Sequence, residues 1–221
     1  MRLSAVTRPV ILCARARYLS SSRRIRVYTK TGDKGTSQLF TGERREKHDE
    51  VFHALGDTDE LNSVVGVARE HTRATADAGD ERMLVLSDQL VEIQSRLMDV
   101  GSAVATPLDT ASDAKLARAA FGEGHATALE EWIDEMDDSL PPLKNFILPG
   151  GGLASAHLHH ARSVCRRAER RVAPLVTQGR AEAGVGVYLN RLSDFFFVAA
   201  RFTAQQEGHD DTVYQKNSSN E

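Results

Sequence analysis

Three arginines recur every four residues in the segment HLHHARSVCRRAERRVAPL, at Arg162, Arg166 and Arg170. Each four-residue step along an α-helix turns the side chain by only about 40° around the axis, so the three guanidiniums would stack along one helix face. Guanidinium forks match the oxygens of phosphate groups, and such a row could hold a polyphosphate. A solvated basic face without a ligand is the alternative interpretation.

A loop rich in glycine, lysine and hydroxyl side chains lies near the start of the chain. It reads YTKTGDKGT over residues 28–36, and FTGERR follows over residues 40–45. Backbone N–H groups and ammonium groups in such a loop could cradle phosphates. The pattern GxxxxGK[ST] is absent, so this is not a Walker loop, and an ordinary flexible turn is the alternative.

Apolar residues recur at steps of three and four over most of the chain, which predicts helices rather than strands. We expect 71–80 to be a connection and 105–124 to be a long loop with one helical turn, and 25–29 is a candidate short strand. Five helices joined by short to moderate loops, with no internal repeat, indicate an all-α five-helix bundle. The predicted helices cover about 50–70, 81–104, 125–136, 153–176 and 182–206.

Charge is unevenly distributed along the 221 residues, which contain 28 Lys and Arg against 31 Asp and Glu. Residues 1–32 contain eight of the basic residues and no acid, which leaves 20 basic and 31 acidic residues in the rest of the chain. An acidic body repels polyanions, so no nucleic acid is expected as a partner. The apolar runs are too short to span a bilayer, so no membrane segment is expected.

The basic beginning of the chain is rich in Arg and Ser, a composition typical of mitochondrial transit peptides. We therefore expect a transit peptide over 1–26, a folded domain over 27–216, a flexible tail over 217–221, and residence in the mitochondrial matrix. A disordered basic tail is the alternative for the first segment. The two cysteines, Cys13 and Cys165, are too few for a disulfide scaffold or a Cys-based zinc site, and a reducing compartment fits them.

Other chemical motifs are weak. Glu50 and His53 match one half of a di-iron bundle motif, but a second Glu-x-x-His is missing. The cluster of His157, His159 and His160 has no supporting ligands at metal-binding spacing, so these residues are expected at the surface. Neither a serine nucleophile elbow nor a Gly-x-Gly-x-x-Gly fingerprint is present.

Five motifs in this order resemble those of the PduO-type ATP:cob(I)alamin adenosyltransferases, particularly the mitochondrial type. They are YTKTGDKGTSQLFTGERREK, GDTDELNS, FILPGGG, CRRAERR and LNRLSDFFFVAAR, and the resemblance covers residues 27–216. It implies a homotrimer of five-helix bundles with active sites between subunits. It also implies transfer of the 5′-deoxyadenosyl group of ATP to cob(I)alamin, which is formed by reduction of cob(II)alamin, with Mg²⁺ required and adenosylcobalamin and triphosphate as products.

The resemblance also implies roles for individual residues. Asp59 and Arg162 match a charge pair across the subunit contact that shapes the nucleotide site, and Phe146 matches the aromatic residue under the corrin ring. Asp57 stands where relatives often have Thr, a difference expected to leave the matched ligand positions untouched. The residues expected to contact ATP are Thr29, Lys30, Thr31, Gly32, Ser37, Gln38, Lys47, Arg166, Arg167, Glu169, Arg170 and Asn190.

In such a reaction cobalt(I) is the nucleophile, so the protein needs no nucleophilic side chain of its own. Its expected work is to align cobalt with C5′ and to stabilise the negative charge that grows on the leaving triphosphate. A reductase system and an adenosylcobalamin-dependent mutase are the implied protein partners. A non-catalytic cobalamin carrier with the same fold is the alternative function.

Overall fold

The structure, a computed structural model, describes residue 28 and residues 30–76 and 79–217. The predicted transit peptide, residue Thr29, and all but Tyr28 of the predicted strand at 25–29 lie outside these residues. The predicted 217–221 tail lies outside them as well, apart from its first residue.

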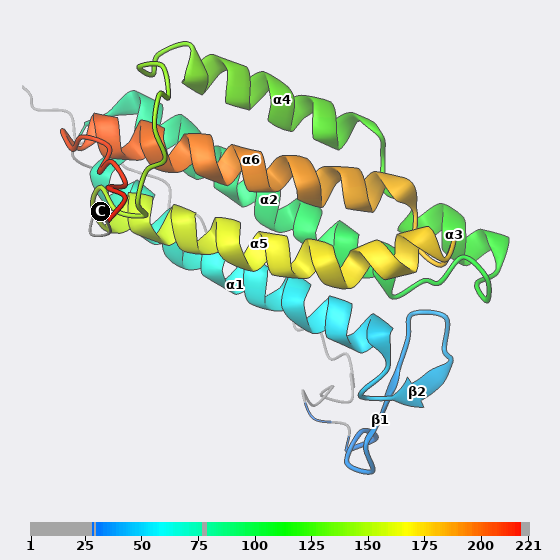
Figure 1. Ribbon diagram of the computed structural model, residues 1–221. Helices are drawn as coiled ribbons and strands as arrows, with labels where there is room; N and C mark the ends of the chain where they lie inside the picture. The colour runs from blue at the N-terminus through cyan, green and yellow to red at the C-terminus, as the bar shows by residue number, and fades with distance from the viewer. Residues whose placement is uncertain (1–27, 29, 77–78, 218–221) are drawn as a thin grey trace, which may run out of the picture.

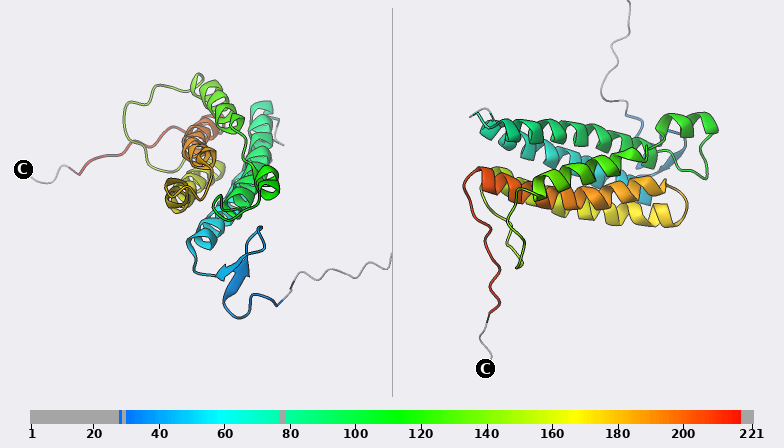
Figure 2. Two further views of the ribbon diagram at one scale, coloured as in Figure 1. Left: turned by 90° about the vertical axis from the view of Figure 1, so that its right-hand side faces the viewer. Right: turned by 90° about the horizontal axis from the view of Figure 1, so that it is seen from above.

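Within the described residues, four long helices, α1, α2, α5 and α6, lie side by side, and α4 runs along the outer side of α6 (Figures 1 and 2). The predicted all-α bundle is therefore confirmed, with a short α3 in addition. None of the helices among the described residues combines the length and apolar character needed to cross a bilayer. Their bounds are α1 Glu50–Ala76, α2 Glu81–Val104, α3 Asp113–Ala119, α4 Gly124–Asp137, α5 Leu153–Thr177 and α6 Ala183–Gln206.

The core forms where the apolar stripes of the helices meet. On α5 the buried apolar stripe runs from Leu158 to Leu175. On α6 the side chains of Tyr188, Phe195 and Phe196 are all at most 1% exposed and form the aromatic part of the core. Large rings contribute much of the apolar area that folding removes from water, so α6 supplies the largest side chains of the core.

Two predicted boundaries were wrong. Helix α1 continues six residues beyond the expected end, where Thr72 is buried and the hydroxyl of Thr75 donates a 2.8 Å hydrogen bond to Glu207 Oε1. The loop over 105–124 contains α3, which is two helical turns rather than one. Both helical segments are rich in polar and small residues, so they lack the apolar periodicity on which the prediction was based.

A small antiparallel hairpin precedes α1, with β1 at Thr36–Gln38 and β2 at Arg44–Glu46. The chain turns at Gly42, whose φ of +90° is a conformation that favours glycine. After the hairpin, the carboxylate of Asp49 accepts a hydrogen bond of 2.9 Å from the N–H of Val51 and caps the start of α1. The hairpin thereby fixes the position of the glycine-lysine loop, residues 30–35, at the end of the bundle where α1 begins (Figure 1).

Candidate active site

The arginine row of α5 lies on an exposed face of that helix. Arg166 and Arg170 are exposed, and Arg170 Nη1 donates a 3.0 Å hydrogen bond to the backbone oxygen of Arg166. Among the described residues, neither guanidinium forms an ion pair with a carboxylate. Two adjacent positive charges without an acidic partner repel each other, and an anion bound between them would relieve that repulsion.

Towards α6, the row is bordered by fixed side chains. Asn190 Nδ2 donates a 2.9 Å hydrogen bond to Glu169 Oε1, which joins α6 to α5. The guanidinium of Arg162 stands 5.3 Å from the centre of the Phe197 ring, within the range of a cation–π interaction. Glu169, Asn190 and Arg162 therefore lie beside Arg166 and Arg170.

Towards α1, the neighbouring arginines are neutralised. Arg167 Nε lies 3.4 Å from Asp57 Oδ1, Arg171 Nε lies 3.4 Å from Asp57 Oδ2, and Arg167 also pairs with Glu60. The expectation that Asp57 leaves the matched ligand positions untouched was wrong, because Arg167 was among the residues expected to contact ATP. Asp57 and Glu60 together make the α1 side of the helix a structural contact.

The glycine-lysine loop folds around Gly32. Its carbonyl accepts a 3.2 Å hydrogen bond from the N–H of Gly35, and the carbonyl of Gly35 accepts one of 2.8 Å from the N–H of Lys47. A Cβ added at Gly32 would lie 3.5 Å from the Lys47 ammonium, so that ammonium sits directly over the loop. Lys30 has a φ of 59°, a left-handed conformation that is uncommon outside glycine and that marks a constrained backbone.

Other members of the predicted loop set are placed by β1. Arg44 on β2 donates hydrogen bonds of 2.6 Å to the carbonyl of Thr31 and 2.7 Å to the hydroxyl of Thr36, so it holds the loop against the hairpin. Ser37 and Gln38 lie in β1 behind that loop. The structure therefore brings Lys30, Thr31, Gly32, Ser37, Gln38 and Lys47 into one small region of the chain.

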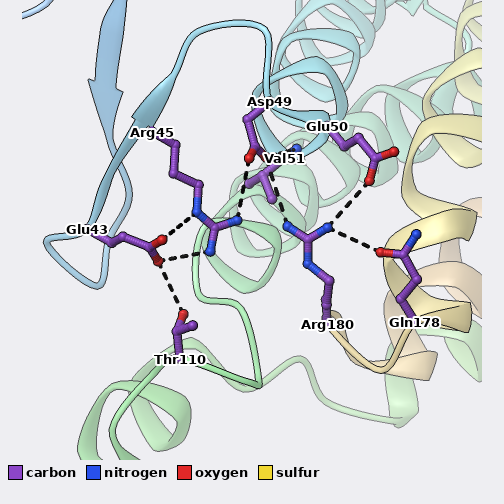
Figure 3. A network of polar contacts seen from close by, with 8 residues as sticks. All are labelled: Glu43, Arg45, Asp49, Glu50, Val51, Thr110, Gln178 and Arg180. Carbon is purple, nitrogen blue, oxygen red and sulfur yellow. Dashed lines mark hydrogen bonds and ion pairs between the residues drawn. The ribbon is translucent and has the colours of Figure 1, made fainter.

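An ionic network anchors the hairpin to the bundle (Figure 3). Arg45 donates two hydrogen bonds to Glu43, of 2.7 and 2.9 Å, and lies 3.7 Å from Asp49. Arg180, in the turn between α5 and α6, pairs with Asp49 at 3.9 Å and with Glu50 at 3.4 Å. The hydrogen bond from Arg45 lowers the pKa of the Glu43 carboxyl and raises the pKa of Arg45 itself. Sequence reasoning missed this network because its members are spread over four segments.

Phe146 lies on the loop that joins α4 to α5, and its side chain is 84% exposed. Its carbonyl accepts a 2.8 Å hydrogen bond from the N–H of Tyr214 in the C-terminal segment. With Leu143, Lys144, Asn145, Tyr214 and Lys216 it lines an open hollow at the surface. A large, exposed aromatic side chain on an ordered loop is typical of a binding surface.

Two sets of predicted residues do not meet within one chain. The loop with Phe146 lies at the end of the bundle where α5 begins, whereas the glycine-lysine loop lies at the other end (Figure 1). The 25 residues of α5 span about 37 Å between these ends. Asp59 lines a groove between α1 and α2 with Leu55 and Met98, away from Arg162, which faces α6.

The histidine cluster differs from expectation. His159 is buried, with its ring 6.1 Å from that of Phe197, and burial lowers its pKa. His157 stacks on His71 of α1 at 4.9 Å, so only His160 is fully at the surface. Within the part of the chain that the structure describes, no three His, Cys, Asp or Glu side chains are grouped in a way that could hold a metal ion.

Comparison with known proteins gives a consistent result. A family model described as cobalamin adenosyltransferase matches residues 27–203. The corrinoid adenosyltransferase MMAB of Mus musculus is 51% identical over 191 residues, covering 86% of this chain and 78% of the mouse protein. The human protein of the same name is 50% identical over 192 residues, covering 87% of this chain and 74% of the human one. The corrinoid adenosyltransferase of Bacillus subtilis is 38% identical, covering 88% and 94%.

Solved structures agree with this. A variant of the PduO-type ATP:corrinoid adenosyltransferase from Lactobacillus reuteri, complexed with cobalamin and ATP, aligns with a TM-score of 0.75 and 36% identity, covering 86% of this chain and all of the other. Another variant of that enzyme, complexed with ATP, aligns with a TM-score of 0.72, 37% identity and the same coverage.

Proposed function

The chain belongs to the cobalamin adenosyltransferase family, and we propose on that premise that it transfers the 5′-deoxyadenosyl group of ATP to cob(I)alamin. The electron pair of cobalt(I) forms a bond to C5′, and the C5′–O bond breaks, with its electrons leaving on triphosphate. Adenosylcobalamin and triphosphate are the products. The observation that carries this proposal in the structure is the exposed pair Arg166 and Arg170, which has no carboxylate partner among the described residues.

Arg166 and Arg170 would bind the triphosphate. Charge grows on the leaving phosphate oxygens as the C5′–O bond breaks, and guanidiniums already in place stabilise that charge more in the transition state than in the ground state. The hydrogen bond between Asn190 and Glu169 keeps both polar groups next to the arginines, where they would contact the nucleotide. Arg167, which is paired with Asp57 and Glu60, would contribute to ATP binding only through its positive potential.

The glycine-lysine loop would supply the second half of the ATP site. We assign it Thr29, Lys30, Thr31, Gly32, Ser37, Gln38 and Lys47, with Lys47 as the ammonium that reaches the phosphates. The close approach of Lys47 to Gly32 supports this, because the same ammonium can neutralise a phosphate held by the loop N–H groups.

A site built from these parts would lie between subunits of a homotrimer. The support is geometric, because the glycine-lysine loop and Phe146 lie at opposite ends of one bundle (Figure 1). The groove that Asp59 lines is open on the α1–α2 side, and Met98 beside it is 63% exposed, so a neighbouring subunit's Arg162 helix would cover both. Mixing inactive Lys47→Ala and Arg166→Ala subunits tests this arrangement. Recovery of activity is expected only if one site draws on two chains.

Phe146 would act on the corrinoid. An apolar ring against the lower face of the corrin excludes an axial ligand from cobalt(II). Losing that ligand lowers the energy of the orbital that accepts the electron, so cobalt(II) becomes easier to reduce. The exposure of Phe146 at 84% supports this role, since the ring is free to face a ligand rather than the core.

Magnesium would be bound together with ATP. Mg²⁺ keeps several waters and is commonly held by substrate phosphates and one or two carboxylates, so it needs no cage of protein side chains. Glu169 is the carboxylate beside Arg166 and Arg170 that could take this role, and its contact with Asn190 leaves its second oxygen available for it. The metal would screen charge between the phosphates, and the arginines would orient them.

The cellular setting is also part of the proposal. A transit peptide over 1–26 would deliver a mature domain, 27–216, to the mitochondrial matrix, followed by a short tail over 217–221. The acid-free composition of the first segment supports this, as does the start of the family match at residue 27. A reductase system would supply the electron to cobalt(II), and an adenosylcobalamin-dependent mutase would receive the product.

The direct test is to incubate the purified protein with ATP and chemically reduced cobalamin and to measure triphosphate and adenosylcobalamin together. Equal amounts of both products are expected. If the protein binds cobalamin and ATP but releases no triphosphate, it is a carrier with the same fold and the proposed function is wrong.

A further inference from the structure

Arg201 is the only Lys, Arg, Asp or Glu that is buried among the described residues, with 3% of its side chain exposed. It lies near the end of α6, on the side that faces the loop between α4 and α5. An arginine stays protonated in a protein, so its charge has to be compensated by fixed partners. A buried guanidinium with few partners is therefore sensitive to the position of each one.

Its two hydrogen-bond partners come from segments outside the bundle. Arg201 Nε donates a 2.9 Å hydrogen bond to Asp211 Oδ2 in the C-terminal segment. Its Nη2 donates one of 2.8 Å to the carbonyl of Pro141, at the start of the loop that carries Phe146. The more exposed Asp137, at the end of α4, lies 3.9 Å from Nη1. One buried side chain thus ties α6 to both segments.

The two segments also pair with each other. The N–H of Leu148 donates a 2.8 Å hydrogen bond to the carbonyl of Thr212, and the N–H of Tyr214 donates one of 2.8 Å to the carbonyl of Phe146. Ile147 and Val213 form an antiparallel bridge between these bonds. Figures 1 and 2 show the loop and the C-terminal segment leaving the bundle together. The backbone of Phe146 is therefore held by the segment that Asp211 anchors.

The other side of the loop allows little movement. A Cβ added at Gly151 would lie 2.6 Å from the Cβ of Ala204 on α6, and the Ser155 hydroxyl donates a 2.6 Å hydrogen bond to the carbonyl of Gly150. Gly151 thus packs directly on the same helix that carries Arg201. The Phe146 loop is fixed at its start by Arg201 and at its end by this contact.

We propose that Arg201 is a positioning residue for the corrinoid half of the reaction. Through Asp211 and Pro141 it holds the Phe146 backbone, and with it the ring, in a fixed position relative to the end of α6. This rests on the proposed function of Phe146. Arg201 lies far along α6 from Asn190 and from the ATP residues, so its removal should affect the cobalt(II) state and leave nucleotide binding intact.

The test uses the full chain with ATP and cob(II)alamin and measures the four-coordinate cobalt(II) signal by electron paramagnetic resonance. Asp211→Asn removes the negative charge that pairs with Arg201 and leaves the bond to Pro141. Arg201→Lys keeps the positive charge but replaces the planar guanidinium, which bonds to two partners at once, with a single ammonium. In both variants the four-coordinate fraction should fall about threefold or more, because a small displacement of a positioned group has a large effect on a reacting geometry. The dissociation constant of ATP should change by less than about twofold, and Arg201→Met should lose more signal than Arg201→Lys.

Arg96→Lys is the matched control, because Arg96 forms two ion pairs on α2, with Glu92 and Asp99, that do not touch the loop. It should retain the parent signal. A four-coordinate signal equal to that of the parent in Asp211→Asn and Arg201→Lys would overturn the proposal. If the Arg201 variants fail to fold, the signal of Asp211→Asn is sufficient to test it. Phe146→Ala distinguishes a failure of the proposed role of Phe146 from a failure of the positioning role of Arg201. If Phe146→Ala keeps the full four-coordinate signal, the proposed role of Phe146 is wrong, and so is the positioning role of Arg201. If Phe146→Ala loses the signal while the Arg201 and Asp211 variants keep it, only the positioning role of Arg201 is contradicted.

Discussion

Arg167 Nε lies 3.4 Å from Oδ1 of Asp57, so the basic helix α5 is paired with α1 on one side. The next arginine on that side, Arg171, lies 3.4 Å from the other oxygen of the same carboxylate. Arg166 and Arg170, one position earlier in each turn, have no such partner among the described residues. The arginine-rich helix therefore has a structural side and a free side, and the free side is the one assigned to ATP.

Asp57→Asn should tighten ATP binding. It removes a negative charge near the phosphate site and leaves Arg167 with Glu60 as its ion-pair partner. Exposed ion pairs are worth about 0.2–1 kcal/mol, so the dissociation constant should fall by up to about fivefold at low salt. Titration calorimetry at two salt concentrations measures this, and the gain should shrink at high salt because screening weakens it. Weaker ATP binding in Asp57→Asn would contradict the assignment of Asp57 to a purely structural pair.

Arg180→Gln should loosen the anchor of the hairpin without touching the chemistry. Arg180 pairs with Asp49 and Glu50 at the start of α1, and those pairs are partly exposed (Figure 3). We expect the KM for ATP to rise by about two- to fivefold with kcat nearly unchanged, since a less ordered loop lowers affinity before it lowers turnover.

Arg191→Gln provides the comparison for that variant. Arg191 forms two ion pairs of similar exposure, one with Glu130 on α4 and one with Asp194 on its own helix α6, and neither reaches the hairpin. Its KM for ATP should match that of the parent. An equal rise in both variants would mean that Arg180 acts through general stability.

The contribution of Glu43 should depend on pH. Its hydrogen bond from Arg45 lowers its pKa, so the stabilisation is present above the unfolded value of about 4.3 and is lost as pH falls through the lower folded value. The urea midpoints of the parent and Glu43→Gln should therefore differ near pH 6 and converge towards about pH 3. A constant difference across that range would show that the carboxylate charge plays no part.

Cys165 should be inert in the folded protein. It is fully buried, its Sγ donates to the carbonyl of Leu189 at 3.2 Å, and burial raises the pKa of the thiol. In a Cys13→Ser background, a thiol reagent at pH 8 should react at least about a hundredfold more slowly than in urea, since the reactive species is the thiolate. Equal rates with and without urea would mean that the α5–α6 contact opens freely.

Much of the fold can be predicted from the sequence because the long helices carry strong apolar periodicity. The helix over 81–104 is predictable to the residue, although one of its leucines, Leu84, is 49% exposed. The last six residues of α1 and the strands β1 and β2 are not predictable in this way. They are stabilised by side-chain hydrogen bonds and by tertiary anchors such as Arg45, which leave no periodic trace.

The residues of the candidate site likewise differ in whether local helix geometry or tertiary packing determines their position. Arg166, Arg170 and Glu169 are predictable because helix geometry alone puts them on one face. Their partners are not, because the pairing of Glu169 with Asn190 depends on how α5 packs against α6. Arg201 offers no sequence signal at all, since an arginine in an apolar helix is ordinarily expected at the surface. Its role follows only from where the loop and the C-terminal segment fold.

The most direct measurement of the central claim is calorimetric titration of ATP into Arg166→Ala, with Arg171→Ala as the control from the paired side of the same helix. Loss of a charged hydrogen-bond set costs about 1.5–3 kcal/mol, so the dissociation constant should rise by about 10- to 150-fold in Arg166→Ala. Arg171→Ala should stay within about threefold of the parent. Unchanged ATP binding in Arg166→Ala, or an equal loss in both variants, would contradict the claim that the free arginine face of α5 binds the triphosphate.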